Sequence, residues 1–326
     1  MRFVLTEPPA RNTLTGGYLY NAQVVAAAPP GACELRVCSV ADLQDTLDRP
    51  PRAGEVLVLD SLYLSQIDPR CWSAHCVVHL VHSLPAQASA RVDQALAQAR
   101  GCIATSAFMA DRVKARAAAA RTRVCHPGVV ARPQLSETPG PVPTVLTVAN
   151  FERRKGHLAL LQALARVSDL PFAWDVIGDP DADPACAAEF SVALARAGLA
   201  ERVRVRGVCS PRDVQRAMSA ASLFALLSVD EPYGMVYAES IAHGTPVVAW
   251  RQGGVLEIVA DGATGLLADA GDVDAAAEQL RRLLASSDAR ARMRRHCARA
   301  AATMPTWETC ARGFVTACRD LLGVRT

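Results

Sequence analysis

The stretch LFALLSVDEPYGMVYAESIAHGTPVVA, residues 223–249, decides the fold. It begins with a short apolar run, Leu223 to Leu227, and it ends with a second one, Pro246 to Ala249. A helical stretch from Met235 to Ala242 lies between them and begins directly after Gly234. Two short apolar strands joined by a helix are typical of a βαβ unit with parallel strands. This stretch therefore predicts an α/β protein.

Two glutamates of this stretch, Glu231 and Glu239, are separated by eight positions. A helical step of that length turns through about 800°, so we expect both carboxylates close to one face. The first N–H groups of the helix have no partner within it and form an anion site, which Gly234 lets a ligand approach closely. The pattern indicates a ligand with phosphate and hydroxyl groups. The alternative is a solvated amphipathic helix with Glu231 as an ordinary loop acid.

The same alternation runs through the rest of the 326 residues, except between residues 133 and 143, where four prolines occur without periodicity. We therefore predict two Rossmann-like domains, over residues 1–132 and 144–305, joined by a linker over residues 133–143. A last helix follows in residues 306–326, with Thr306 as its N-cap. The other predicted strands are Phe3–Thr6, Leu35–Val40, Val56–Leu59, Val77–Val81, Cys102–Thr105, Arg123–Cys125, Thr144–Val148, Ala173–Ile177 and Val203–Arg206. The other predicted helices are Tyr18–Ala28, His157–Val167, Pro184–Ala197, Asp213–Ala220, Val273–Ala285, Ala289–Thr303 and Trp307–Leu322.

Composition excludes several classes of protein. The net charge is +3, and no basic stripe is interleaved with aromatic residues, so we expect no nucleic-acid partner. The arginine-rich run from Arg281 to Arg299 is interpreted as a solvated helix face, and weak association with a membrane surface is the alternative. The eleven cysteines are irregularly spaced, which is typical of reduced, buried thiols. With no signal-peptide pattern and no run of 18 apolar residues, we expect a cytoplasmic protein without a membrane-spanning segment.

A cationic cluster follows the first strand of the second half, in Arg153, Arg154 and Lys155. Ligands of open parallel sheets bind beyond the carboxyl ends of the strands, and a diphosphate would suit these cations. Lys155 would act as a point charge, and either arginine as a bidentate fork. The alternative is a solvated basic turn.

Four segments of the second half resemble the retaining family-4 glycosyltransferases. They are ANFERRKGH (residues 149–157), RVRVRGV (202–208), EPYGMVYAE (231–239) and HGTPVVAWRQGGVLEIVADGATGLL (243–267). The resemblance implies the B-type glycosyltransferase fold, with two Rossmann-like domains facing across a cleft. It also implies that the N-terminal domain binds the acceptor and that the last helix packs back on that domain.

The resemblance implies a role for each matching residue. Glu239 would accept hydrogen bonds from the ribose hydroxyls of the donor, Glu231 would contact its sugar, and Lys155 would bind its phosphates. Asn150 stands where the family often has an arginine, so Arg153 or Arg154 would replace that group. The remaining donor-binding positions are the amides of Gly234, Met235 and Val236, the base-reading edge Gly207, Val208 and Cys209, and the N-terminal glycine loop Gly16 and Gly17.

One strand of the first half carries two histidines, His79 and His82, that point to opposite faces. His82 stands at the carboxyl end and matches the family's active-site histidine. The alternative for His82 is a polar strand residue that is hydrogen-bonded within the protein and has no functional role. His79 remains the other candidate for the histidine that faces the cleft.

Metal sites are the weaker interpretation. The spacing of Cys71, His75, Cys76, His79 and His82 matches no structural zinc pattern. Asp179, Asp181 and Asp183 could chelate a divalent cation, but the cationic cluster already supplies charge for a diphosphate. We expect no metal and no other cofactor.

The resemblance implies a retaining enzyme that transfers a hexose from a UDP- or GDP-linked sugar to a hydroxyl of an acceptor. The first half is short for the family and leaves little room for acceptor loops, so we expect the acceptor to be a small soluble metabolite. Glu231, His82 and Lys155 are the predicted catalytic residues. The alternatives are a nucleotide-sugar epimerase or hydrolase of the same fold, and a non-catalytic nucleotide-sugar-binding protein. The sequence indicates neither the sugar nor an oligomeric state.

Overall fold

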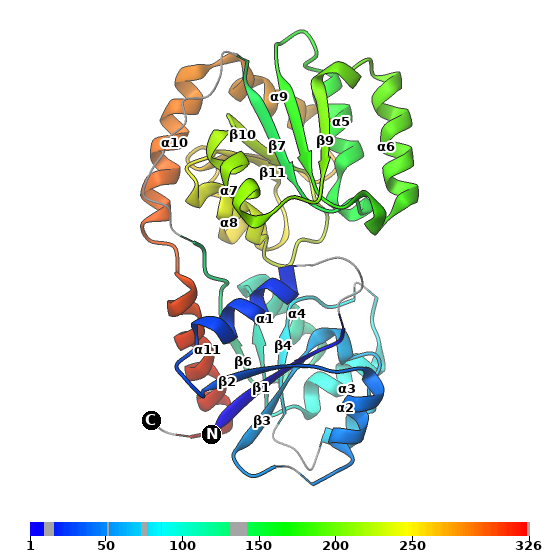
Figure 1. Ribbon diagram of the computed structural model, residues 1–326, viewed down its shortest axis with the longest axis vertical. Coiled ribbons are helices and arrows are strands. Elements are labelled where there is room, and N and C mark those ends of the chain that lie inside the picture. Colours follow the sequence, from blue (N-terminus) through cyan, green and yellow to red (C-terminus); the bar gives the residue numbers. More distant parts are fainter. Residues whose placement is uncertain (10–15, 51, 73–76, 86, 131–141, 325–326) are drawn as a thin grey trace. The chain divides into compact units, whose positions relative to one another are not determined.

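The structure is a computed structural model, and it describes residues 1–9, 16–50, 52–72, 77–85, 87–130 and 142–324. These residues form two compact units (Figure 1). The first unit comprises Met1–Gly128 and Pro305–Thr326, and the second comprises Val129–Met304. Each unit contains a six-stranded parallel sheet covered by helices, which confirms the predicted α/β class. The predicted linker lies largely outside the described residues.

The first unit has the strand order β2-β1-β3-β4-β5-β6. Its strands are β1 (Arg2–Glu7), β2 (Cys33–Val37), β3 (Glu55–Asp60), β4 (Val77–Val81), β5 (Gly101–Ala104) and β6 (Thr122–Val124). Its α-helices are α1 (Gly16–Ala27), α2 (Val40–Leu47), α3 (Ala90–Gln98), α4 (Ala107–Arg116) and α11 (Trp307–Leu322), and its 3₁₀ turns are η1 (Ser61–Tyr63) and η2 (Pro69–Trp72). Alternate residues of the strands pack with α2, α3 and α4 in one apolar core.

The last helix belongs to the first unit, where it packs against α1 and β5. Thr306 accepts a hydrogen bond from the N–H of Thr309 and caps the helix, as predicted. At the other end Arg121 donates hydrogen bonds to the carbonyls of Leu321 and Asp320, at 2.7 and 2.9 Å. Both ends of α11 thus have partners for backbone groups that the helix itself leaves unsatisfied.

The second unit has the strand order β12-β11-β10-β7-β8-β9. Its strands are β7 (Thr144–Val148), β8 (Ala173–Ile177), β9 (Val203–Gly207), β10 (Leu223–Leu226), β11 (Val247–Trp250) and β12 (Gly265–Ala268). Its α-helices are α5 (His157–Ala165), α6 (Pro184–Arg196), α7 (Pro211–Ala220), α8 (Met235–Ala242), α9 (Val273–Ala285) and α10 (Ser287–Ala301), and its 3₁₀ turns are η3 (Arg153–Lys155), η4 (Pro180–Ala182), η5 (Ala200–Arg202) and η6 (Gly253–Glu257). Helices α5, α6 and α9 pack on one face of the sheet, and α7, α8 and α10 on the other.

Several predicted boundaries were wrong because a capping residue decides where a helix begins. Ser39 caps α2, so Val40 belongs to a helix and β2 ends at Val37. Ser210 and Ser286 likewise start α7 and α10 two residues before the predicted positions. Helix α5 ends two residues before its predicted end.

The prediction that Glu231 and Glu239 share a face of one helix was also wrong, because only Glu239 lies in a helix. Helix α8 begins at Met235, so Glu231 lies in a loop, and Glu239 is the fifth residue of the helix. Asp230 and Gly234 both have positive φ angles, of 55° and 101°. The backbone from Asp230 to Gly234 is therefore not helical, and the rotation of an α-helix does not apply between the two glutamates.

The aspartates after β8 have structural partners. Asp179 accepts a hydrogen bond from the N–H of Asp181, and Asp183 accepts one from the N–H of Cys186 and caps α6. These caps account for two of the three carboxylates considered as metal ligands. Within the part of the chain that is described, no helix combines the length and the apolar character needed to cross a membrane.

Candidate active site

A buried ion pair lies at the carboxyl ends of β7 and β10 in the second unit. The Nζ atom of Lys155 donates a hydrogen bond to Oε2 of Glu231 at 2.9 Å, and the two side chains are 16% and 9% exposed. The turn that carries Lys155 is closed by Gly156, which has a φ of 70°. A Cβ atom at Gly156 would lie 2.0 Å from the carbonyl oxygen of Leu227, so the absence of a side chain lets this turn lie directly against the end of β10.

The loop that carries Glu231 is held by its neighbours. The N–H of Gly254 donates to the carbonyl oxygen of Glu231 at 2.9 Å, and the side-chain amide of Gln252 donates to the carbonyl of Ser228 at 2.7 Å. The hydroxyl of Tyr237 bonds to the carbonyl of Leu226 at 3.0 Å and to the Ser228 hydroxyl at 2.7 Å. The carboxylate of Glu231 therefore projects from a fixed backbone.

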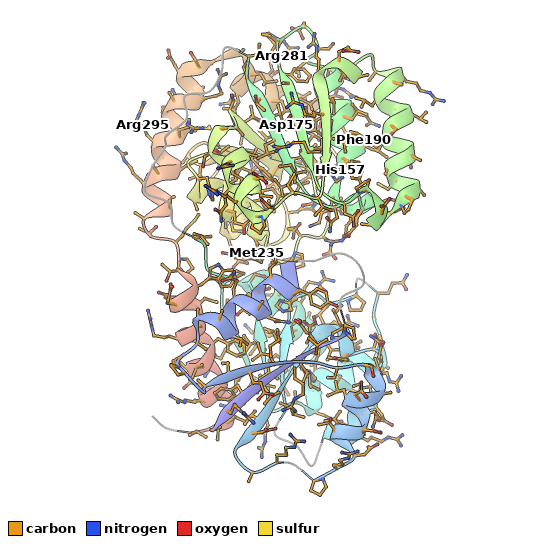
Figure 2. All side chains as sticks on the ribbon, viewed as in Figure 1. His157, Asp175, Phe190, Met235, Arg281 and Arg295 are labelled. Carbon is orange, nitrogen blue, oxygen red and sulfur yellow. The ribbon has the colours of Figure 1, made fainter. Side chains whose placement is uncertain are left out.

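Helix α8 opens on Gly234 and has no side-chain cap. The N–H groups of the first turn, including those of Met235 and Val236, are thus available to a ligand. Met235, the first residue of α8, is labelled in Figure 2. The positive end of the helix dipole adds to their attraction for an anion. This end of α8 is a suitable site for one phosphate group.

Glu239 lies one turn farther along the same helix and is half-buried. Burial raises the pKa of its carboxyl group to about 7. Among the described residues no side chain donates a hydrogen bond to this carboxylate, although its backbone carbonyl accepts one from Nδ1 of His243 at 2.7 Å. A half-buried acid without a protein partner is suited to receive hydroxyl groups of a ligand.

The other predicted members of the donor site lie apart from this ion pair. Asn150 accepts a hydrogen bond from the N–H of Asp179 at 3.1 Å and so fixes the turn after β8. Arg153 pairs with Glu189, and Arg154 with Glu152, both at 2.7 Å near the surface. Of the three neighbouring cations, Lys155 is the one that reaches Glu231.

The predicted base-reading edge lies at the end of β9. Gly207 has a φ of 66°, which ends the strand, and the side chain of Val208 is 74% exposed. Cys209 is half-buried. The exposed apolar side chain of Val208 offers a surface for a planar ring.

A second cluster lies in the first unit, where the start of α1 meets the end of β4. A Cβ atom at Gly17 would lie 3.3 Å from Cδ2 of His82, so glycine at this position lets the helix approach the imidazole closely. Gly16 is the first residue of α1 and is exposed. The ring of Tyr20 meets the imidazole edge-on, with centroids 5.1 Å apart. The structure thus brings together Gly17 and His82, which the sequence suggested separately.

His79 in β4 and His82 just after it have different surroundings. His79 is fully buried, and burial lowers its pKa to about 4. The side chain of His82 is 13% exposed and lies at the carboxyl end of the strand. Of these two histidines, His82 is therefore the one with access to a ligand.

Three residues around His82 were missed from the sequence. The Asn21 amide donates to Oε2 of Glu7 at 2.7 Å and to Oδ2 of Asp60 at 3.1 Å, and Nε2 of His82 lies 2.9 Å from its Oδ1. Glu7 and Asp60 are 6% and 2% exposed. Burial raises the pKa of Glu7, and the charge of Asp60 raises it further. A signal was present, because Glu7, Asp60 and His82 each stand at or just after the end of a predicted strand.

A family comparison decides the class of the protein. Residues 133–300, just over half of the chain, match the family described as "Glycosyl transferases group 1". The chain belongs to the glycosyl transferases group 1. This confirms the glycosyltransferase resemblance of the motifs around Lys155, Glu231 and Glu239.

Relatives of this group 1 chain act in different settings according to their names. It is 35% identical over 182 residues to the D-inositol 3-phosphate glycosyltransferase of Corynebacterium urealyticum, covering 53% of this chain and 42% of that protein. It is 31% identical over 157 residues to the lipopolysaccharide core biosynthesis glycosyltransferase LpsE of Rhizobium meliloti, covering 48% and 44%. The chain therefore spans less than half the length of these curated relatives.

Solved structures establish the fold. The structure of Anabaena Alr3699/HepE in complex with UDP and glucose matches with a TM-score of 0.82 and 18% identity, covering 98% of this chain and 100% of that one. The group 1 chain has the B-type glycosyltransferase fold that its sequence predicts.

Proposed function

We propose that this protein is a retaining glycosyltransferase that transfers a hexose from a UDP- or GDP-linked sugar to a hydroxyl group. The observation that carries the proposal is the pairing of Lys155 with Glu231 in the unit that also holds the uncapped start of α8 and the half-buried Glu239. A cation, an anion-binding helix start and two carboxylates match the charges and hydroxyls of a nucleoside diphosphate sugar.

The leaving diphosphate gains negative charge as the glycosidic bond breaks. Lys155 and the N–H groups of Met235 and Val236 would stabilise that charge, because they are fixed before the reaction begins. Losing one such donor typically costs about 3 kcal/mol of barrier, or 10² to 10³ in rate. Their charge makes a metal ion unnecessary, so we expect full activity in excess EDTA.

The carboxylates would orient the donor. Glu231 would accept hydrogen bonds from hydroxyls of the sugar and Glu239 from those of the ribose, while the exposed Val208 would lie against the base. Glu231 is already paired with Lys155, which favours an orienting role over nucleophilic attack on the sugar. In the front-face substitution we propose, the acceptor oxygen bonds to the anomeric carbon as its bond to phosphate breaks. The acceptor proton passes to the departing phosphate oxygen.

His82 and its neighbours would bind the acceptor side of the reaction. Gly16 and Gly17, at the start of α1, keep their proposed role toward the donor phosphates, and Gly17 also lets α1 approach the imidazole closely. We propose a small soluble polyol or hydroxylated heterocycle as the acceptor. The relative acting on inositol 3-phosphate supports a small acceptor, whereas the name of LpsE associates that relative with a lipopolysaccharide.

The first test is a panel of UDP- and GDP-hexoses, assayed for binding by calorimetry and for release of nucleoside diphosphate. Addition of a small-molecule extract should yield a glycoside with the anomeric configuration of the donor, which NMR would establish. An inverted product would exclude the retaining mechanism. An epimerised sugar released without acceptor would indicate an epimerase instead.

Binding of the donor is tested by Glu239→Ala, with Glu278→Ala on the exposed face of α9 as the matched control. We expect Glu239→Ala to weaken donor binding at least tenfold with the fold intact, because it removes a charged acceptor of ribose hydroxyls. Unchanged affinity would refute the ribose role. Failure of every nucleotide sugar to bind the wild-type protein would refute the transferase itself.

A further inference from the structure

The side-chain amide of Asn21 lies among three ionisable groups of the first unit. It reaches Glu7 at the end of β1, Asp60 at the end of β3 and His82 just after β4. Asn21 is 1% exposed, so its amide depends on these protein partners for its hydrogen bonds. The position of each donor and acceptor can therefore be assigned from chemistry.

The orientation of the Asn21 amide follows from its two acidic neighbours. A carboxyl group has oxygen atoms that accept hydrogen bonds whether or not it is ionised, and an amide nitrogen has two hydrogens to donate. Those two hydrogens meet Oε2 of Glu7 at 2.7 Å and Oδ2 of Asp60 at 3.1 Å. The opposite orientation would place the amide oxygen against both acids. The amide oxygen must therefore face His82.

This orientation determines which imidazole nitrogen carries the proton. The amide oxygen can accept a hydrogen bond but cannot donate one, and it lies 2.9 Å from Nε2 of His82. The Oδ2 atom of Asp60, 3.6 Å from the same nitrogen, is a second acceptor beside it. The amide oxygen of Asn21 can bond to Nε2 only if Nε2 carries the hydrogen, and the nearby oxygen of Asp60 favours the same position.

We infer that Asn21 is a positioning residue that holds His82 in the tautomer protonated at Nε2 and leaves the lone pair of Nδ1 for a hydroxyl group of a substrate. Among the described residues none bonds to Nδ1 of His82. The substrate part of this inference rests on the proposed glycosyltransferase function, whereas the tautomer does not.

Other contacts keep the imidazole in place. The backbone N–H of His82 donates to the hydroxyl of Ser61 at 3.2 Å, and the Tyr20 ring meets the imidazole edge-on. Asp60 itself is fixed, because its Oδ1 accepts from the N–H of Leu62 at 2.9 Å. Burial lowers the pKa of His82 more strongly than the charge of Asp60 raises it, which favours the neutral ring.

The tautomer can be measured without any substrate. In ¹⁵N-labelled full-length protein, a long-range ¹H–¹⁵N NMR spectrum distinguishes protonated from unprotonated ring nitrogens, and a His82→Gln variant assigns the His82 signals. We expect the Nε2 signal of a protonated nitrogen and the Nδ1 signal of an unprotonated one at neutral pH. A proton on Nδ1, or a rapidly exchanging mixture, would overturn the inference.

Two variants separate positioning from general stability. Asn21→Leu removes the acceptor at 2.9 Å and leaves Asp60 at 3.6 Å, beyond hydrogen-bond distance. We therefore expect the tautomer preference to weaken and kcat to fall about tenfold, with little change in the donor KM. Asn21→Asp keeps an acceptor oxygen and adds a negative charge beside Glu7 and Asp60, so Nε2 should stay protonated and the pKa of His82 should rise. A wild-type tautomer signal in folded Asn21→Leu would contradict the role of Asn21.

The two proposals fail separately. If the wild-type ring is protonated at Nε2 but no sugar is transferred, the tautomer assignment stands and the glycosyltransferase proposal falls. If sugar is transferred but Nδ1 carries the proton, the role of Asn21 falls and the function stands.

Discussion

The Nζ atom of Lys155 lies 2.9 Å from Oε2 of Glu231, although 76 residues of chain separate them. Both side chains are largely buried, so each charge depends on the other in the protein without ligand. An ammonium group has three hydrogens to donate, and one bond to Glu231 leaves two for phosphate oxygens. The pair therefore holds a cation in place, at little net charge, where the proposed donor would present its diphosphate.

The first prediction concerns this pair. We expect Lys155→Met to lower the free energy of unfolding by about 3 kcal/mol, because it leaves the carboxylate of Glu231 buried without its counter-charge. The same change should lower kcat by about 10²- to 10³-fold, because the leaving diphosphate loses a cation. Urea denaturation and initial-rate measurements would give the two values.

A double-mutant cycle supplies the control. Glu231→Gln alone should also destabilise the fold, whereas Lys155→Met combined with Glu231→Gln should restore most of the stability without restoring activity. Additive losses of stability in the double variant would show that the two charges do not depend on each other.

The second prediction follows from the raised pKa of Glu239. The pKa is about 7 in the folded protein, against an ordinary value of 4.5. Between these values the folded protein binds more protons than the unfolded chain, so this group lowers stability as pH rises. Glu239→Gln removes the ionisation, and we expect it to be more stable than wild type at pH 8 by up to about 3 kcal/mol.

The advantage of Glu239→Gln should disappear towards pH 4.5, where the wild-type carboxyl group is protonated in the folded state. Chemical denaturation at several pH values would measure it. Glu278→Gln, on the exposed face of α9, is the matched control. A constant stability difference for Glu239→Gln across this pH range would exclude a pKa raised by burial.

The sequence predicts the two sheets well, because most of their strands are apolar runs that alternate with helices. Strand β12 was missed because Gly265–Ala268 is four residues long, has no β-branched residue and pairs with β11 alone. Helix boundaries were predicted less accurately. One capping hydroxyl, as at Ser39, outweighs the strand propensity of the residue that follows it.

The sites were predicted in part. The motifs indicate Lys155 and Glu231 as residues of one site, but their ion pair depends on how two strand ends meet, which no local pattern specifies. The partners of His82 depend in the same way on three strands and one helix. The pKa of a side chain also depends on its burial, which a sequence pattern does not give, and the raised pKa of Glu239 is the clearest case.

The third prediction compares two glycines with nearly the same backbone angle. Gly156 has a φ of 70° and Gly198 a φ of 66°, but a Cβ atom would meet Leu227 at Gly156 and open space at Gly198. Gly198→Ala should cost about 1 kcal/mol of stability, the strain of left-handed backbone alone. Gly156→Ala should cost at least about 3 kcal/mol, because the turn must also move away from β10. Equal losses in urea denaturation would show that the contact with β10 does not matter.

The last prediction concerns the approach of α1 to His82. At Gly17 a Cβ atom would lie 3.3 Å from Cδ2 of His82, close enough to push the ring by a few tenths of an ångström. Alanine is favoured over glycine within a helix by up to about 1 kcal/mol, so we expect Gly17→Ala to leave the free energy of unfolding nearly unchanged. If His82 acts on the substrate, kcat should nevertheless fall several-fold, because small displacements of a catalytic group slow the reaction.

Gly313→Ala in α11 is the matched control for Gly17→Ala, since its Cβ atom would lie at an ordinary distance of 3.9 Å from Sγ of Cys125. This variant should gain up to about 1 kcal/mol of stability and keep its activity. Stability from urea denaturation, initial rates and the NMR signals of the His82 ring should be recorded for both variants. The signals should shift in Gly17→Ala and stay unchanged in Gly313→Ala. Full activity of Gly17→Ala with shifted His82 signals would mean that the exact place of the imidazole does not limit the reaction.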